Sequence, residues 1–249
     1  MKSSILKVNN LSKTYYSKEG SVKALQDISF DLTKGEILSI VGPSGSGKST
    51  ILNIIGNSDK DYLGTITMNK NLTIGYVTQE DDLISNMTCF NNAILFLKVL
   101  NKVNKETINY VDYLLSIYGL SDFKNKKVSS LSGGMKKRLS IIRALSIKPD
   151  ILLIDEAFSS LDFVSRLNIY ESIYKIIKEE NITTILVTHD IEEAISLSDK
   201  IIVLSKRPSS IKKVYNISFT LSKSILDRRN FSNFSLYFKD IWENIDNYE

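Results

Sequence analysis

The stretch Gly42-Pro43-Ser44-Gly45-Ser46-Gly47-Lys48-Ser49-Thr50 decides the fold of this chain. From Gly42 to Ser49 it matches the pattern G-x-x-x-x-G-K-[ST], in which backbone amides surround a phosphate and the lysine and hydroxyl reach the terminal phosphates and Mg²⁺. An apolar run of strand length precedes the loop at 37–41, and a helical apolar pattern follows at 49–55. This context predicts a nucleotide-phosphate site, because glycines let the backbone close around a phosphate and a helix N-terminus attracts anions.

Further apolar runs alternate with helical patterns toward the C-terminus. The runs at 151–154, 184–187 and 201–204 are continuously apolar, which is typical of strands covered on both faces. Helical patterns at 165–180 and 191–198 separate them. This rhythm predicts a parallel α/β sheet.

The middle and the end of the chain differ from this rhythm. Two helical patterns without an intervening strand, at 91–100 and 105–118, predict a helical insertion over about residues 82–135. A break at 205–208 then separates an α/β domain, residues 1–208, from a basic and aromatic appendage, residues 209–249. In that appendage one helical stripe is expected, formed by Phe231, Phe234, Phe238, Ile241 and Ile245.

Composition limits the classes to which the protein can belong. The chain has 249 residues, 43% of them hydrophobic and 24% charged, which is ordinary for a globular protein and excludes a disordered or fibrous one. Its net charge of +4 is mild, and no specific nucleic-acid partner is expected. One cysteine, Cys89, and one histidine, His189, exclude an intrachain disulfide and a multi-histidine metal site. No secretory signal or membrane-spanning run is found, so a membrane role is expected only through a partner.

Two acidic residues, Asp155 and Glu156, follow the apolar run at 151–154. A carboxylate at the C-terminal end of such a strand lies where open α/β sheets bind ligands. Asp155 is therefore a candidate to hold Mg²⁺, and Glu156 to orient or deprotonate an attacking water. A strand that simply ends in solvated acids is the plainer interpretation, which the neighbouring phosphate loop disfavours.

The run Leu131-Ser132-Gly133-Gly134-Met135 precedes another helical pattern. Ser132 is expected to cap that helix, and two glycines at a helix start form a nest suited to an anion. A plain loop-to-helix cap fits these residues equally well, so local physics does not decide between the two.

In this order the residues resemble the nucleotide-binding subunit of ATP-binding-cassette (ABC) transporters over about residues 5–208. The matching motifs are, along the chain, the adenine-stacking aromatic (Tyr15, with Val22 lining the same pocket), the Walker A loop (Gly42, Pro43, Ser44, Gly45, Ser46, Gly47, Lys48, Ser49 and Thr50), the Q-loop glutamine (Gln79), the signature (Ser132, Gly133, Gly134 and Met135), Walker B with the catalytic glutamate (Asp155 and Glu156), the D-loop (Ser159-Ser160-Leu161-Asp162) and the switch histidine (His189).

The resemblance implies a P-loop NTPase of the RecA-like α/β type, with an antiparallel β subdomain near the N-terminus and an inserted α-helical subdomain. It implies ATP and Mg²⁺ as ligands, with Ser49, Gln79 and Asp155 on the metal, Glu156 and His189 as catalytic residues, and Asp162 in the D-loop. It also implies a dimer, because in the family each ATP lies between the Walker A loop of one subunit and the signature of another.

A finer resemblance is to ATPases of nitrate, sulfonate and taurine importers. Four features support it: the methionine that ends the signature, the pair Gln79-Glu80, the residues at 187–194 and the run Leu204-Ser205-Lys206-Arg207-Pro208. The expected partners are a second ATPase subunit, membrane permease subunits and an extracellular solute-binding protein, and the expected location is the cytoplasmic face of the membrane. The departures include Lys137, where a glutamine is usual, and Ser85-Asn86, where Pro-Trp is usual.

Other functions remain open at this stage. Residues 12–56 look equally like ATPases of lipoprotein-release and macrolide exporters. A soluble ABC-type ATPase acting on ribosomes or DNA is disfavoured, because such proteins generally carry two cassettes or a long coiled-coil insertion. A degenerate subunit without hydrolysis is disfavoured by the intact Lys48, Asp155, Glu156 and His189.

Single residues also allow plainer interpretations. Tyr16 is an alternative to Tyr15 for stacking on adenine, and His189 could be an ordinary surface histidine. Cys89 is expected to be a small core residue, and the aromatic stripe is expected to pack on the protein itself, with contact to anionic lipid as the alternative.

Overall fold

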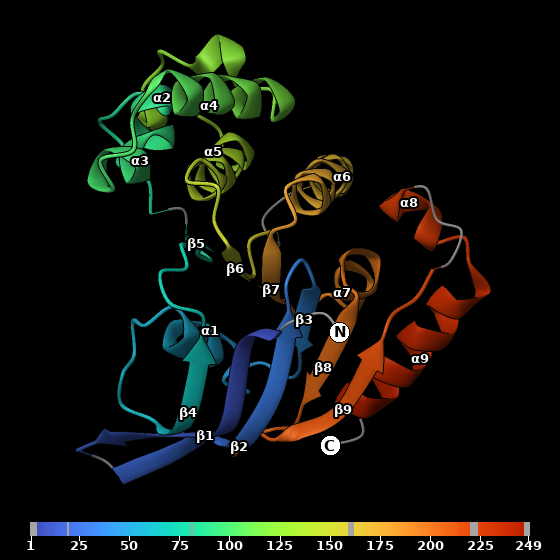
Figure 1. Cartoon of the computed structure of the whole chain (residues 1–249). Helices are drawn as coiled ribbons and strands as arrows, with labels where there is room; N and C mark the ends of the chain where they lie inside the picture. The colour runs from blue at the N-terminus through green and yellow to red at the C-terminus, as the bar shows by residue number, and fades with distance from the viewer. Residues whose placement is uncertain (1–3, 19, 81, 159–161, 220–223, 247–249) are drawn as a thin grey trace. The chain divides into compact units, whose positions relative to one another are not determined.

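The computed structural model describes residues 4–18, 20–80, 82–158, 162–219 and 224–246 (Figure 1). Within it the chain forms two compact units. The first unit is Met1–Leu72 together with Thr183–Glu249, and the second unit is Thr73–Ile182. Among the described residues, no helix is both long enough and apolar enough to cross a bilayer.

The first unit contains the antiparallel sheet expected near the N-terminus. It consists of β1 (Ser4–Ser17) between β2 (Gly20–Thr33) and β4 (Leu63–Met68), and both pairs are antiparallel. The apolar positions of β1 and β2, such as Leu6, Leu11 and Ile28, are fully buried.

The parallel strands of the first unit surround β3 (Ile37–Val41). This strand pairs in parallel with β7 (Thr183–Val187) on one side and with β8 (Lys200–Leu204) on the other. All five residues of β3 and of β7 are buried, as their continuous apolar runs predict. The helices α1 (Lys48–Ile55) and α7 (Ile191–Leu197) follow β3 and β7 in the chain, as expected.

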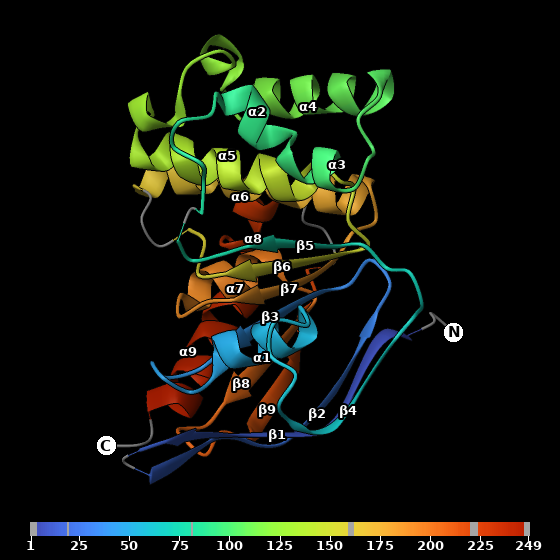
Figure 2. The same ribbon diagram turned by 90° about the vertical axis from the view of Figure 1, so that its left-hand side faces the viewer.

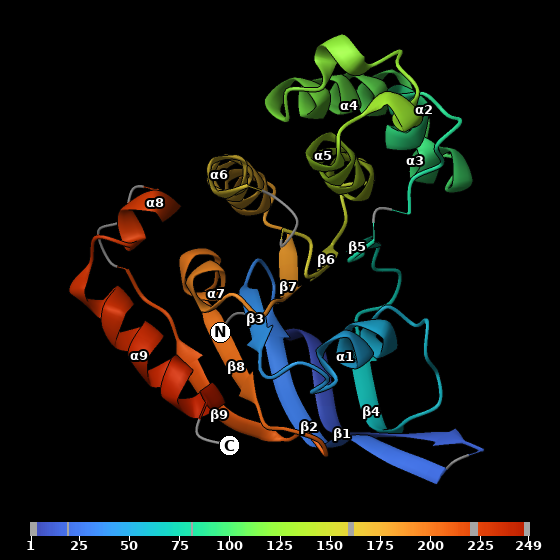
Figure 3. The same ribbon diagram turned by 180° about the vertical axis from the view of Figure 1, so that it is seen from behind.

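Residues 209–249, expected as an appendage, contribute a strand and two helices to the first unit. β9 (Ile211–Asn216) pairs antiparallel with β8, and α9 (Ser232–Asp246) packs on α7 and β8, as Figures 1 and 3 show. The expected stripe packs inward, with Phe234 and Ile241 buried beside Ile195. The short helix α8 (Ile225–Arg228) brings Arg228 to α7, where its guanidinium donates to the Ser196 carbonyl at 2.7 Å.

The second unit contains parallel strands β5 (Ile74–Val77) and β6 (Ile151–Asp155), together with most of the helices (Figure 2). The helix expected at 91–100 is instead two short helices, α2 (Cys89–Ala93) and α3 (Leu95–Val99), which meet at Ile94. The remaining elements are α4 (Lys105–Ile117), two 3₁₀ turns (Ser121–Phe123 and Val128–Ser130), α5 (Gly133–Leu145) and α6 (Phe163–Glu179). The strand β5 is short and contains Gly75, and the sequence pattern did not predict it.

Candidate nucleotide-binding site

The phosphate loop connects β3 to α1, as the sequence predicts. Gly45 and Gly47 have φ of 73° and 84°, a left-handed conformation that favours glycine. Gly47 is also the N-cap of α1, so no side chain occupies the helix N-terminus. Lys48 is 5% exposed, and its ammonium donates to the carbonyls of Gly42 at 2.9 Å and Pro43 at 3.0 Å. The loop therefore fits a phosphate, which would meet backbone amides and this ammonium.

The glycines of this loop also leave no room for side chains. A Cβ on Gly42 would lie 3.1 Å from the Cβ of Leu204, at the end of β8. A Cβ on Gly47 would lie 2.8 Å from Cδ2 of Leu25, on β2. The loop is thus enclosed by β2 and β8, two strands outside the recognised motif.

The turn between β8 and β9 supports the loop from its other side. Ser209 is fully buried, and its hydroxyl lies 2.5 Å from the Ser46 carbonyl, to which it donates. Backbone hydrogen bonds fix this serine to β2, from Ser209 to Ala24 at 3.0 Å and from Gln26 to Ser209 at 2.8 Å. In the same turn, Nη2 of Arg207 lies 3.2 Å from the place a Cβ would take on Gly45. The sequence pattern indicates a break here and a run, Leu204–Pro208, that supports the family resemblance, but it does not predict the contact with the phosphate loop.

Replacing Ser209 by alanine is expected to raise the dissociation constant for ATP about three- to tenfold. The change leaves the buried Ser46 carbonyl without its hydrogen-bond donor, and an unsatisfied buried acceptor costs about 1–3 kcal/mol. The loop can recover part of this free energy by moving, but the moved loop no longer has the geometry that binds phosphate. Isothermal titration calorimetry measures the effect. Ser210→Ala is the matched control, since Ser210 is exposed and has no side-chain contact with the loop among those described. Equal affinities of the two variants would contradict the role given to Ser209.

The candidate adenine pocket lies beside this loop. Tyr15 pairs directly with Val22 across β1 and β2, so the two side chains share one face of the sheet. Their exposed fractions are 44% and 47%, and the Tyr15 hydroxyl lies 3.2 Å from the Thr50 hydroxyl on α1. Tyr16 is 80% exposed. This geometry favours Tyr15 over Tyr16 as the residue that stacks on adenine.

A buried lysine fixes the tyrosine in place. The Lys13 ammonium lies 4.9 Å from the centre of the Tyr15 ring and 2.8 Å from the Asp59 carboxylate. Burial opposes charge on both groups. The hydrogen bonds and charges of Asp59 and Asp61 outweigh it at Lys13 and hold the pKa of that ammonium above its ordinary value, while Lys13 and the Asp61 amide hold the pKa of Asp59 below its ordinary value. Local sequence does not reveal the role of Lys13, because its partner Asp59 is 46 residues away in the chain.

His189 is held at the same sheet edge as the phosphate loop. Ile40 of β3 is in register with Val187 of β7, so the residues after both strands emerge side by side. The neighbours of His189 are fixed: Thr188 donates its hydroxyl to the Glu193 carboxylate at 3.0 Å, and Asp190 caps α7. His189 itself is exposed. The first unit therefore brings together the phosphate loop, Tyr15, Val22 and His189.

The second unit holds the two acidic candidates. Asp155 ends β6 and is 7% exposed. Burial and then the charge of Asp155 raise the pKa of the Tyr76 hydroxyl on the adjacent strand β5. Glu156 has a φ of 44°, in the left-handed region. A non-glycine residue there costs on the order of 1 kcal/mol, and such strain is concentrated at functional sites.

The signature residues lie at the N-terminus of α5. Ser132 caps the helix, as predicted, and accepts from the Met135 amide at 3.3 Å. Ser132 and Gly133 are exposed. A Cβ on Gly133 would meet no atom within 4 Å, so the chain's own packing does not require glycine here. The glycine leaves the helix N-terminus accessible from outside.

The remaining predicted residues also lie in the second unit. Gln79 follows β5 and is exposed, and Asp162 is exposed just before α6. Ser159, Ser160 and Leu161 of the expected D-loop lie outside the described residues. Cys89 is fully buried, and burial raises the pKa of its thiol to about 11, which agrees with a structural core residue.

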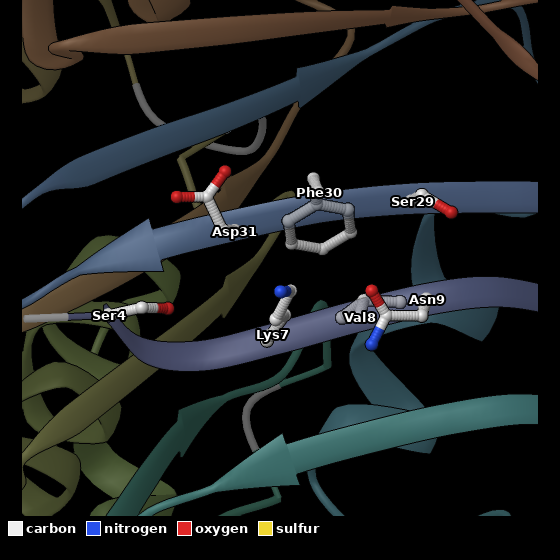
Figure 4. Close-up of a pocket in the computed structure, with 7 residues that line it drawn as sticks. All are labelled: Ser4, Lys7, Val8, Asn9, Ser29, Phe30 and Asp31. Atoms are coloured by element: carbon white, nitrogen blue, oxygen red, sulfur yellow. The ribbon is translucent and has the colours of Figure 1, made fainter.

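The described residues outside the phosphate loop offer few further ligand sites. Within the described ranges, no group of three or more His, Cys, Asp or Glu side chains is placed to hold a metal. The side chains of Gln79 and Asp155 in the second unit, and separately that of Ser49 in the first unit, offer oxygen atoms of the kind that Mg²⁺ prefers. A hollow of about 360 Å³ between β1 and β2 is lined by residues such as Lys7, Phe30 and Asp31 (Figure 4). It contains none of the predicted site residues.

The sequence of this chain matches the model of a known protein family. The protein-family model described as "ABC transporter" matches residues 25–159. The chain belongs to the ABC transporter family. It is an ATP-binding ATPase of that family, and its α/β P-loop fold is the one expected.

Curated relatives cover between 86% and 99% of the chain. It is 35% identical to an uncharacterized ABC transporter ATP-binding protein, YtlC, of Bacillus subtilis, over 99% of this chain and 97% of that protein. It is 39% identical to the taurine import ATP-binding protein TauB of Roseobacter denitrificans, over 86% of this chain and 82% of that protein. It is 35% identical to the aliphatic sulfonates import ATP-binding protein SsuB of Bacillus anthracis, over 87% of this chain and 88% of that protein.

Solved structures show the same fold. A dimeric bacterial ABC transporter cassette, MJ0796, superimposes with a TM-score of 0.76 at 31% identity, over 86% of this chain and 99% of that chain. A post-hydrolysis state of the same cassette, bound to ADP and Pi, gives 0.75 at 32% identity over the same shares of the two chains.

Proposed function

We propose that this ABC ATPase is the energy-supplying subunit of a membrane importer for a small solute of the taurine, sulfonate or nitrate class. The observation that carries the proposal is the match to taurine and aliphatic sulfonate import ATP-binding proteins over more than 80% of both chains. The exporter alternative lacks comparable support, because the relatives reported above that name a solute name import. In this proposal the chain acts at the cytoplasmic face of the membrane, held there by permease subunits.

ATP is proposed to lie between two copies of the chain. Its adenine stacks on Tyr15 beside Val22, and its phosphates enter the loop from Gly42 to Thr50. The signature residues Ser132, Gly133, Gly134 and Met135 of the second copy approach the terminal phosphate. The open space at Gly133 and the uncrowded N-terminus of α5 support this arrangement, because a helix N-terminus attracts an anion. The dimeric cassette among the similar structures supports it as well.

Hydrolysis is proposed to depend on Glu156, His189 and Lys48. Glu156 orients the attacking water and accepts its proton, while His189 donates to the γ-phosphate, and Lys48 stays on the phosphates throughout. Mg²⁺, held by Ser49, Gln79 and Asp155, would neutralise charge on the phosphate oxygens. Loss of the γ-phosphate removes the contacts that join the two copies. The dimer therefore alternates between two states, and this alternation would drive the permease.

The solute assignment is tested in cells that lack this gene. Uptake of labelled taurine, an alkanesulfonate and nitrate is measured with an empty vector, the wild-type gene or the Glu156→Gln gene. Loss of uptake of one of these solutes, restored only by the wild type, is the expected result. Unchanged uptake of all three, with efflux of a macrolide or release of lipoproteins lost instead, would overturn import in favour of the exporter alternative.

The shared ATP site leads to a prediction at Gly133. Gly133→Asp is expected to abolish ATP-dependent dimerisation while the melting temperature changes by only about 2 °C. Since a side chain there meets no atom within 4 Å, and an acid in the first turn favours a helix by about 0.3–1 kcal/mol, the fold should tolerate it. The new carboxylate would repel the phosphate of the partner's ATP.

Light scattering with and without ATP measures this dimerisation in the hydrolysis-deficient Glu156→Gln background. Ser129→Asp is the matched control. Ser129 is exposed, and the aspartate that replaces it adds the same charge just before the signature. Dimers that persist in Gly133→Asp would show that this helix N-terminus does not receive the partner's nucleotide.

A further inference from the structure

We infer that Lys137 is a positioning residue that fixes the Gln79 segment to the helix carrying the signature. The inference rests on the proposed roles of Gln79 and of residues 132–135. It concerns contacts within the second unit alone, and it explains a residue that departs from the glutamine usual in the family.

Lys137 holds two consecutive backbone carbonyls. Its ammonium donates to the carbonyl of Thr78 at 3.0 Å and to that of Gln79 at 2.9 Å. The residue is only 2% exposed. Burying an ammonium costs free energy unless its protons are donated to acceptors, and the two carbonyls accept two of these hydrogen bonds. The lysine and the two carbonyls therefore stabilise one another. The backbone direction at Gln79, and hence the starting point of its exposed side chain, is thereby tied to α5.

Two more contacts along α5 hold the same segment. Arg143 is 5% exposed and donates to the carbonyl of Asp82 at 2.7 Å. The helix also packs closely on β5, since a Cβ on Gly75 would lie 2.8 Å from the Ala144 carbonyl. Figure 2 shows α5 alongside β5. Gly75, the pair Thr78 and Gln79, and Asp82 therefore contact α5 at three places.

The attachment has a functional consequence. Lys137 lies two residues after Met135, the last signature residue, in the first turns of α5. The Gln79 backbone and the helix N-terminus at Ser132 are therefore joined by one lysine side chain and less than two turns of helix. A displacement of either end is transmitted to the other through packed, hydrogen-bonded contacts, which is the physical form that coupling takes in proteins.

The experiment compares purified full-length Lys137→Met with wild type and with two other variants. Lys137→Met keeps the length and packing of the side chain but removes the donors. It should lower the kcat of ATP hydrolysis about five- to tenfold, leave KM for ATP within about twofold, and speed amide hydrogen exchange in residues 76–82 severalfold. Lys137→Gln, which retains donors, should recover kcat to within about threefold of wild type. Lys136→Met removes the same charge one residue earlier and should match wild type.

The outcomes separate this inference from the proposed function. If Lys137→Met keeps both wild-type kcat and wild-type exchange at 76–82, Lys137 does not position the segment. If Lys48→Ala hydrolyses ATP normally, the proposed nucleotide site fails, whatever Lys137 does. If Lys137→Met does not fold, amide hydrogen exchange of the wild type tests the inference. Residues 78–80 and residues 133–137 should then open together. Protection factors of the two segments that differ by more than about tenfold would overturn the inference.

Discussion

Replacing Glu156 by glutamine should reduce steady-state ATP hydrolysis at least ~100-fold, because a positioned general base contributes about 10²- to 10⁴-fold to such a rate. The glutamine amide has nearly the same shape as the carboxylate but cannot accept the proton of the attacking water. Glu156 already adopts a left-handed φ of 44°, so the backbone, which is unchanged, continues to present the side chain after β6. ATP binding should remain within about twofold of wild type, and ATP should convert the chain to a lasting dimer.

Phosphate release and light scattering with ATP and Mg²⁺ measure the two effects. Glu80→Gln is the control for the loss of one carboxylate, because Glu80 is exposed and is not among the predicted site residues. If Glu156→Gln turns over ATP at the wild-type rate, another group activates the water. If instead hydrolysis stops and no dimer forms, ATP does not join two copies in the proposed way.

Replacing Lys48 by alanine should weaken ATP binding at least ~100-fold, which corresponds to about 2.7 kcal/mol. The ammonium is 5% exposed and lies within 3.0 Å of the loop carbonyls of Gly42 and Pro43, where an entering phosphate would compete for it. Charge-assisted hydrogen bonds contribute about 1.5–3 kcal/mol each. Hydrolysis at moderate ATP concentrations should therefore disappear together with binding.

Calorimetric titrations with ATP, ADP and AMP test where Lys48 acts. Because the lysine is proposed to reach the β- and γ-phosphates, its loss should weaken ATP and ADP strongly and AMP little. Lys60→Ala, on the exposed segment after α1, controls for the lost charge. An equal loss for all three nucleotides would indicate a collapsed loop, and full hydrolysis by Lys48→Ala would refute the nucleotide site.

Sequence was sufficient where local pattern determines structure. Continuous apolar runs predicted β3, β6, β7 and β8, because strands covered on both faces bury every apolar residue of such a run. The loop from Gly42 to Ser49 was predictable because the conformations of Gly45 and Gly47 depend on glycine itself. Ser132 was predictable as a cap because a serine before a helix satisfies an amide locally. The family resemblance then supplied the roles of residues that lie far apart in the chain.

Contacts between distant segments could not be predicted in this way. The hydroxyl of Ser209 reaches Ser46 only because β8 pairs in parallel with β3, which brings residues 163 positions apart into contact. Lys137 reaches Thr78 and Gln79 across 59 and 58 positions. Ser209 and Lys137 are polar residues, and a polar residue in such a stretch is ordinarily expected to be exposed. Only the tertiary structure shows that the two side chains are buried. The break expected near residue 208 is likewise the turn of a hairpin between β8 and β9.

The pairing of β9 with β8 bears on where such a gene product can be shortened. A version that stopped at residue 208, just after the last recognisable motif, would turn β8 into an unprotected sheet edge. It would also uncover Ile195 and Ile201, which contact Tyr215 and Ile241 in one buried cluster. Bare strand edges next to newly wetted aliphatic side chains recruit other chains and promote aggregation. The strand β9 and the helix α9, which carry no known motif, are therefore part of the scaffold on which the ATPase is built.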